Sequence, residues 1–141
     1  MAPTVVGVCG DCGFDAEGLG PGDAVVAARS LARRWRELLD GVAAREDDGE
    51  LLLTRRLDRG WSPLERAGHV TGVFEHTAEE LLRVWEHEQP LLGEPGGDDA
   101  GRGLAVKRQR GDLLAQLAAA AERLARVIER YEGPDWDRAG V

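Results

Sequence analysis

The chain has 141 residues, 43% of them apolar and 31% charged, a composition typical of a single globular domain and not of a disordered segment. Its 26 acidic and 18 basic side chains give a formal net charge of −8, which argues against nucleic acid or an anionic membrane surface as the main partner. No segment has the roughly 20 consecutive apolar residues that cross a bilayer, and the N-terminus lacks an export signal. We therefore expect a cytoplasmic protein that acts on a small molecule or on another protein, and not on nucleic acid or a membrane.

The first motif along the chain is a C-x-x-C pair, Cys9 and Cys12, which are its two cysteines. Three interpretations are open: half of a zinc site, a redox-active dithiol, or two thiols without a chemical role. A full zinc site has four ligands, and no second C-x-x-C pair supplies the rest, so histidines or a second subunit would have to do so. We treat residues 1–22 as an N-terminal knuckle segment and residues 23–141 as a helical domain.

Residues 18–22 combine glycine and proline and predict a break in the chain, after which Asp23 is a candidate N-cap. A first helix is predicted over 24–40, with Gly41 at its end, because apolar side chains recur there at helical spacing. The apolar side chains of this helix are Val25, Ala28, Leu31, Trp35, Leu38 and Leu39. The charged stretch over 45–60 is predicted to be a connection, with 50–54 as a short extended segment.

A second helix is predicted over 63–88, and its start is specified by three residues. Ser62 is a cap residue, Pro63 takes the first helical position, where its missing N–H costs nothing, and Glu65 completes a capping box. Pro90 predicts the end, because the residue before a proline is pushed out of the helical conformation. The apolar stripe in between consists of Leu64, Ala67, Gly68, Thr71, Phe74, Ala78, Leu81, Leu82 and Trp85.

Residues 93–103 are rich in glycine and acidic side chains and predict a crossover loop that is long for a helical bundle. A third helix is predicted over 112–132. Its apolar stripe consists of Leu113, Leu117, Ala120, Leu124, Val127, Ile128 and Tyr131. Three amphipathic helices without a strand pattern predict an all-α, up-and-down bundle of antiparallel helices, whose fourth helix is absent or supplied by a partner.

His69 lies beside the apolar stripe of the second helix, one turn after Glu65. A histidine in this position either donates a hydrogen bond within the bundle or binds a metal ion. We predict that His69, rather than His76 or His87, faces the bundle interior. His76 lies on nearly the same face but about 10 Å further along the helix axis, so one ion cannot readily bind both rings.

Four stretches stand out together, namely Cys9-x-x-Cys12-Gly13-Phe14-Asp15, Arg34-Trp35, the run WSPLERAGHV over 61–70, and the late Trp136-Asp137. Their combination resembles the DinB-like superfamily, which includes mycothiol-dependent maleylpyruvate isomerases, and the likeness covers most of the chain. The resemblance implies a four-helix bundle that holds one divalent metal ion, in many members with thiol-dependent transferase or isomerase activity. It also implies that His69 matches the metal-binding histidine of the second helix.

The family normally supplies two further metal ligands as an H-x-x-x-H pair, and this chain has no such pair. The chain ends at Val141, about where the fourth helix of the family would begin. If a divalent ion binds, we therefore expect zinc held by Cys9, Cys12 and His69, with one coordination position open.

Two classes of function follow from these observations. The first is a metal- and mycothiol-dependent transferase or isomerase, in which the metal ion would lower the pKa of the bound thiol and so generate a thiolate nucleophile. The alternative is a non-catalytic helical protein that binds a partner or dimerises. A homodimer is expected in either case, because an uncovered apolar flank favours a partner.

Overall fold

The computed structural model describes residues 8, 13, 15, 18–56, 60–87 and 109–130. These residues form four helices: α1 (Pro21–Ala43), α2 (Gly49–Thr54), α3 (Pro63–Glu86) and α5 (Arg110–Arg130). Outside the helices they contain an isolated antiparallel bridge between Val8 and Asp15 and no strand. The prediction of an all-α protein is therefore confirmed for this part of the chain. None of these helices is both long enough and apolar enough to span a membrane.

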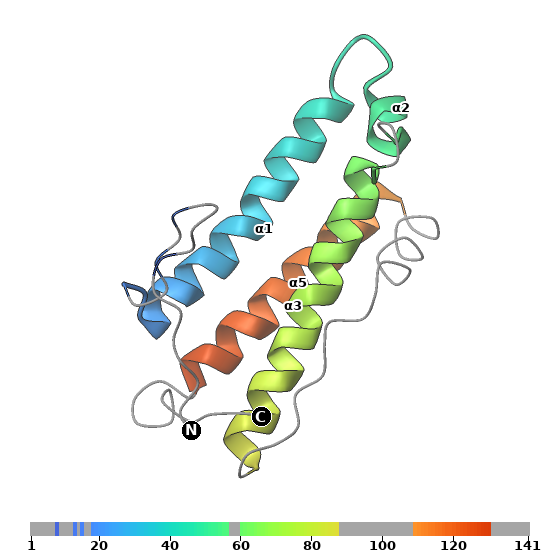
Figure 1. Cartoon of the computed structure of the whole chain (residues 1–141). Coiled ribbons are helices and arrows are strands. Elements are labelled where there is room, and N and C mark those ends of the chain that lie inside the picture. Colours follow the sequence, from blue (N-terminus) through green and yellow to red (C-terminus); the bar gives the residue numbers. More distant parts are fainter. Residues whose placement is uncertain are drawn as a thin grey trace.

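The central helix of the bundle is α5, the last of the described helices (Figure 1). It packs along α1 on one side and along α3 on the other, whereas α1 and α3 scarcely touch each other. The short α2 lies at the end of the bundle where α1 ends and α3 begins. Within the described ranges, no long helix covers the side of α1 and α3 that is turned away from α5.

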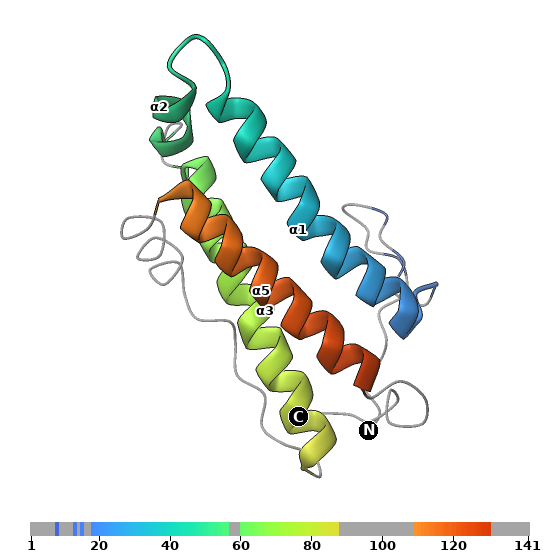
Figure 2. The ribbon, with the colours of Figure 1, turned by 180° about the vertical axis from the view of Figure 1, so that it is seen from behind.

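The long helices do not alternate in direction, as an up-and-down bundle requires. α3 and α5 run in the same direction (Figure 2), and the contacts between them keep the same order, since Glu75 meets Gln116 and Glu79 meets Arg123. The prediction of an antiparallel arrangement is therefore wrong for this pair. The physical reason is the length of the connection: a chain spans up to about 3.3 Å per residue when extended, against 1.5 Å in a helix, so residues 88–109 suffice to return along the whole of α3.

α1 begins three residues earlier and ends three residues later than predicted. Gly20, and not Asp23, is the N-cap, because Pro21 takes the first helical position. Asp23 accepts a hydrogen bond from the Gly20 amide at 3.0 Å instead. At the other end the helix continues through Gly41 to Ala43, since one glycine costs a helix only about 1 kcal/mol and does not force it to stop.

The segment predicted to be extended, 50–54, is the short helix α2. Asp48 precedes it in the left-handed conformation, with φ at 52°, and reverses the chain after α1. Leu53 is buried while Leu51 is 62% exposed. A run of three leucines lacks the alternation that marks a half-buried strand, so periodicity alone did not identify its conformation.

The predicted start of α3 is confirmed in detail. The Glu65 amide donates to Ser62 Oγ at 3.2 Å, and the Ser62 amide donates to Glu65 Oε2 at 2.9 Å, so both halves of the capping box are formed. α3 ends at Glu86, two residues before its predicted end. α5 begins two residues before its predicted start, at Arg110, and the last two residues predicted for it lie outside the described part of the chain. Most of the predicted knuckle segment, residues 1–22, also lies outside the described part of the chain.

The hydrophobic core lies where α5 meets its two neighbours. Its fully buried large side chains are Leu39, Leu53, Leu113 and Leu117. Two leucines of the predicted apolar face of α1 are outside this core, since Leu31 is 39% and Leu38 is 56% exposed. With Trp35 and Val42 they form a second stripe at heptad spacing, which we call the outer stripe of α1.

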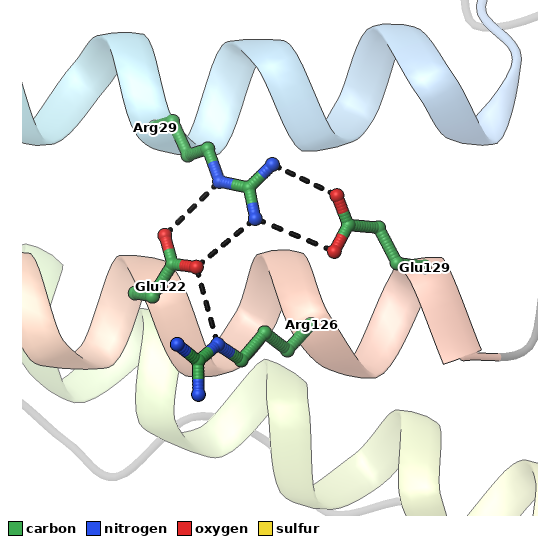
Figure 3. A network of polar contacts seen from close by, with 4 residues as sticks. All are labelled: Arg29, Glu122, Arg126 and Glu129. Atoms are coloured by element: carbon green, nitrogen blue, oxygen red, sulfur yellow. Dashed lines mark hydrogen bonds and ion pairs between the residues drawn. The ribbon is translucent and has the colours of Figure 1, made fainter.

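A polar cluster joins the first half of α1 to the last turns of α5 (Figure 3). The Arg29 guanidinium donates to Glu122 through Nε and Nη2, each at 3.0 Å, and to Glu129 through Nη1 at 2.8 Å. Arg126 Nε donates to the same Glu122 carboxylate at 3.2 Å. The hydrogen bonds from Arg29, and then those from Arg126, lower the pKa of Glu122 from 4.5 to about 2. The cluster is solvent-exposed, so it orients the two helices more than it stabilises them.

Candidate ligand-binding pocket

A pocket of about 420 Å³ is lined by residues from the second half of α1, from α2 and from the start of α3. This volume lies in the range of roughly 300–1,000 Å³ that is typical of small-molecule sites. We call it the tryptophan pocket. Its apolar wall consists of Trp35, Leu38 and Val42 from α1, Leu52 from α2, and Trp61 and Pro63 at the start of α3. Three arginines, Arg45, Arg55 and Arg66, also line it.

The N-terminal cap of α3 holds one wall of the pocket in place. The Glu65 side chain is only 6% exposed. Besides the Ser62 amide it binds Arg56, whose Nε donates to both carboxylate oxygens at 2.9 and 3.0 Å. Arg56 Nη2 donates to the same carboxylate, and these hydrogen bonds raise the pKa of Arg56. Glu65 therefore does more than close a capping box: it ties the residue that follows the C-cap of α2 to the cap of α3. Trp61, next to that cap, is positioned as a result.

A close approach of two backbones holds the opposite wall. Gly49, the first residue of α2, is buried against the last turn of α1. A Cβ atom at this position would run into the carbonyl oxygen of Val42 and come within 2.8 Å of that of Ala43. Glycine thus lets α2 approach α1 closely enough for Leu52 to face the same pocket as Val42.

The predicted metal ligand His69 is next to this pocket. Its ring packs edge-on against Trp61, with ring centroids 4.7 Å apart and planes at 70°. His69 is half-buried, but so is His76, whose Nε2 lies 4.0 Å from Glu80 Oε1, whereas His87 is exposed. Burial therefore does not single out His69 among the three histidines. What distinguishes His69 from the other two is its contact with Trp61, which lines the pocket.

The other two predicted ligands, Cys9 and Cys12, lie outside the described residues, so their distance from His69 stays a prediction. Among the residues that the structure describes, no three His, Cys, Asp or Glu side chains lie close enough together to hold a metal ion. By themselves these residues do not supply a complete metal site at His69. Any such site would need ligands from the rest of the chain or from another molecule.

Sequence reasoning missed the pocket and its arginines. Arg45 and Arg55 belong to a stretch that was interpreted as a plain connection, and Arg66 falls on the polar side of a helix. The one available signal was tryptophan: Trp35 lies between the exposed leucines of α1, and Trp61 directly precedes a helix cap. Large aromatic side chains outside a core often mark binding surfaces.

The chain matches no model of a known protein family, no curated protein and no solved structure.

Proposed function

We propose that this chain is a DinB-like helical bundle that binds a small molecule in the tryptophan pocket. The observation that carries the proposal is the pocket itself, which has the volume of a small-molecule site and is lined by two tryptophans and by residues from three separate helices. The side of α1 and α3 that no described helix covers is where the fourth helix implied by the DinB resemblance would fit. The capped second long helix, with Trp61 and His69 near its start, is the part of the fold on which the DinB resemblance depends most.

Binding of the neutral, apolar fluorophore N-phenyl-1-naphthylamine tests this proposal. We expect saturable binding, with shifts of the indole N–H resonances of Trp35 and Trp61. Leu38→Asn should weaken binding about fivefold, because Leu38 is half-exposed and a fully buried leucine contributes about 1.5–3 kcal/mol. Leu51→Asn is the matched control, since Leu51 is 62% and Leu38 56% exposed, but Leu51 does not line the pocket. Absence of saturable binding, or equal loss in both variants, would contradict the proposal.

A metal- and mycothiol-dependent transferase or isomerase is the second function that we propose, and the contact of His69 with Trp61 favours it. His69, which by the family resemblance would be a metal ligand, packs against Trp61 of the pocket wall, so a thiol bound in the pocket would be near it. In this proposal Cys9, Cys12 and His69 hold zinc, with the cysteine thiolates as the strongest ligands.

Elemental analysis of the untagged protein tests the proposed zinc site. We expect the double variant Cys9→Ser with Cys12→Ser to lose most of its zinc, and His69→Ala to retain less zinc than the wild type. His87→Ala is the control, since His87 is exposed at the end of α3. Stoichiometric zinc in the double serine variant would show that the C-x-x-C pair is not the site.

The alternative function, a non-catalytic interaction or dimerisation protein, is supported by the outer stripe of α1. Its exposed leucines, Leu31 and Leu38, flank the half-buried Trp35 along α1. Since Leu38 also lines the tryptophan pocket, a second copy seated on this stripe would limit access to the pocket. Self-association and ligand binding are therefore expected to compete.

A further inference from the structure

We infer that the ligand of the tryptophan pocket is an organic anion with an apolar body, in its simplest form a carboxylate. This inference rests on the proposed small-molecule function and names the class of ligand. Three observations carry it: the apolar wall, the convergence of three arginines on the same pocket, and the absence of acidic side chains among its described lining residues.

The three arginines come from three different elements. Arg45 follows the end of α1, Arg55 is the C-cap of α2, and Arg66 lies in the first turns of α3. All three side chains are exposed, and none forms an ion pair with another described residue. Three arginines that are far apart in the sequence therefore line one pocket.

Most other arginines of the described helices are neutralised. Among the described residues, ion pairs with a carboxylate are formed by Arg29, Arg33, Arg56, Arg83, Arg110, Arg123 and Arg126. In a chain with 26 acidic and 18 basic residues, carboxylate partners are plentiful. The three arginines of the pocket form no ion pair with another described residue, although carboxylates are plentiful. They therefore make a locally positive site on an acidic protein.

The arginines and the tryptophans of the pocket each favour a different part of the ligand. A guanidinium group presents a planar fork of N–H donors that matches the two oxygens of a carboxylate, and such charge-assisted hydrogen bonds are stronger than neutral ones. Trp35 and Trp61 offer flat apolar faces that suit an aromatic or aliphatic body. A ligand with its apolar part against the tryptophans and its anionic end at the arginines satisfies both. A neutral apolar molecule satisfies only one, and a cation is repelled.

Calorimetric titration with 2-naphthoate and its neutral amide, 2-naphthamide, tests the inference, because the two probes share their apolar body and differ in charge. We expect the acid to bind at least about tenfold more tightly than the amide, since hydrogen bonds to charged groups contribute about 1.5–3 kcal/mol. The affinity for 2-naphthoate should fall as salt is raised, because the arginines are exposed. The affinity for 2-naphthamide, which carries no charge, should not change with salt.

The double variant Arg55→Gln with Arg66→Gln should remove most of the preference for the acid and leave binding of the amide unchanged. Arg36→Gln is the matched control, because Arg36 is an exposed arginine of α1 without an ion pair among the described residues and does not line the pocket. Equal affinity for both probes would overturn the anion inference while leaving the pocket intact. Binding of neither probe would refute the proposed function as well. An unchanged preference in the double variant would show that other groups attract the anion.

Discussion

Replacing Leu117 with alanine is expected to lower the free energy of unfolding by about 2–5 kcal/mol, because the change leaves a cavity in the core. Leu117 is fully buried in the middle of α5, the helix that contacts both α1 and α3. Leu117 belongs to the core cluster that also includes side chains of α1 and α3, so its truncation weakens the packing of that core. Alanine has the highest helix propensity, so the loss does not come from α5 itself.

Urea denaturation followed by circular dichroism measures this effect. Leu51→Ala is the control, since Leu51 is 62% exposed on α2 and its truncation is expected to change stability by about 0.5 kcal/mol or less. The dependence of the free energy on urea should stay the same in both variants if unfolding remains cooperative. A loss at Leu117 no larger than that at Leu51 would mean that α5 is not the centre of the core.

Two glycine-to-alanine replacements are expected to act in opposite directions. At Gly49 the new methyl group meets the carbonyl oxygens of Val42 and Ala43, so α2 must move away from α1. Overpacking of this kind costs about 1–3 kcal/mol and sometimes more, and backbone atoms cannot turn aside as a flexible side chain can. At Gly41, also in a helix, nothing lies within 4 Å of the added Cβ, so alanine should stabilise α1 by about 0.5–1 kcal/mol.

Thermal unfolding of the two variants side by side gives the sign of each change. Gly49→Ala should also weaken binding in the tryptophan pocket, because it displaces the helix that carries Leu52 and Arg55. Gly41→Ala should leave binding as it is, since Gly41 does not line the pocket. If Gly49→Ala proved neutral, the close approach of α2 to α1 would not exist in solution.

The sequence predicted the helices well where their signals are local. Ser62 and Glu65 fix the start of α3 through neighbours only three residues apart, and this start was predicted to the residue. At α1 the same kind of signal was present in Pro21, but Asp23 is equally suited to a cap and misled the prediction. The burial of individual side chains was less predictable. Leu31 and Leu39 both belong to the predicted apolar face of the first helix, but only Leu39 is buried by neighbouring elements.

Features that depend on distant parts of the chain could not be predicted in this way. The parallel course of α3 and α5 depends on how the intervening segment returns, which helical periodicity does not report. The tryptophan pocket is lined by Trp35, Arg55 and Arg66 from three elements. No spacing between two residues in the sequence predicts that these side chains line the same pocket. His69 was singled out by its position beside the apolar stripe of the second helix and by the family resemblance, whereas its contact with Trp61 came from the structure.

The central position of α5 also sets the order in which the protein can fold. A ribosome makes the chain from its N-terminus, so α1, α2 and α3 emerge before α5. Because α1 and α3 scarcely touch each other, these first helices have little to pack against until Arg110–Arg130 is complete. Contacts between α1 and α5 then close a loop of more than half the chain, and such long-range closure slows folding relative to bundles of sequential hairpins. During synthesis the nascent chain therefore exposes its apolar faces until nearly the last described residue has been added.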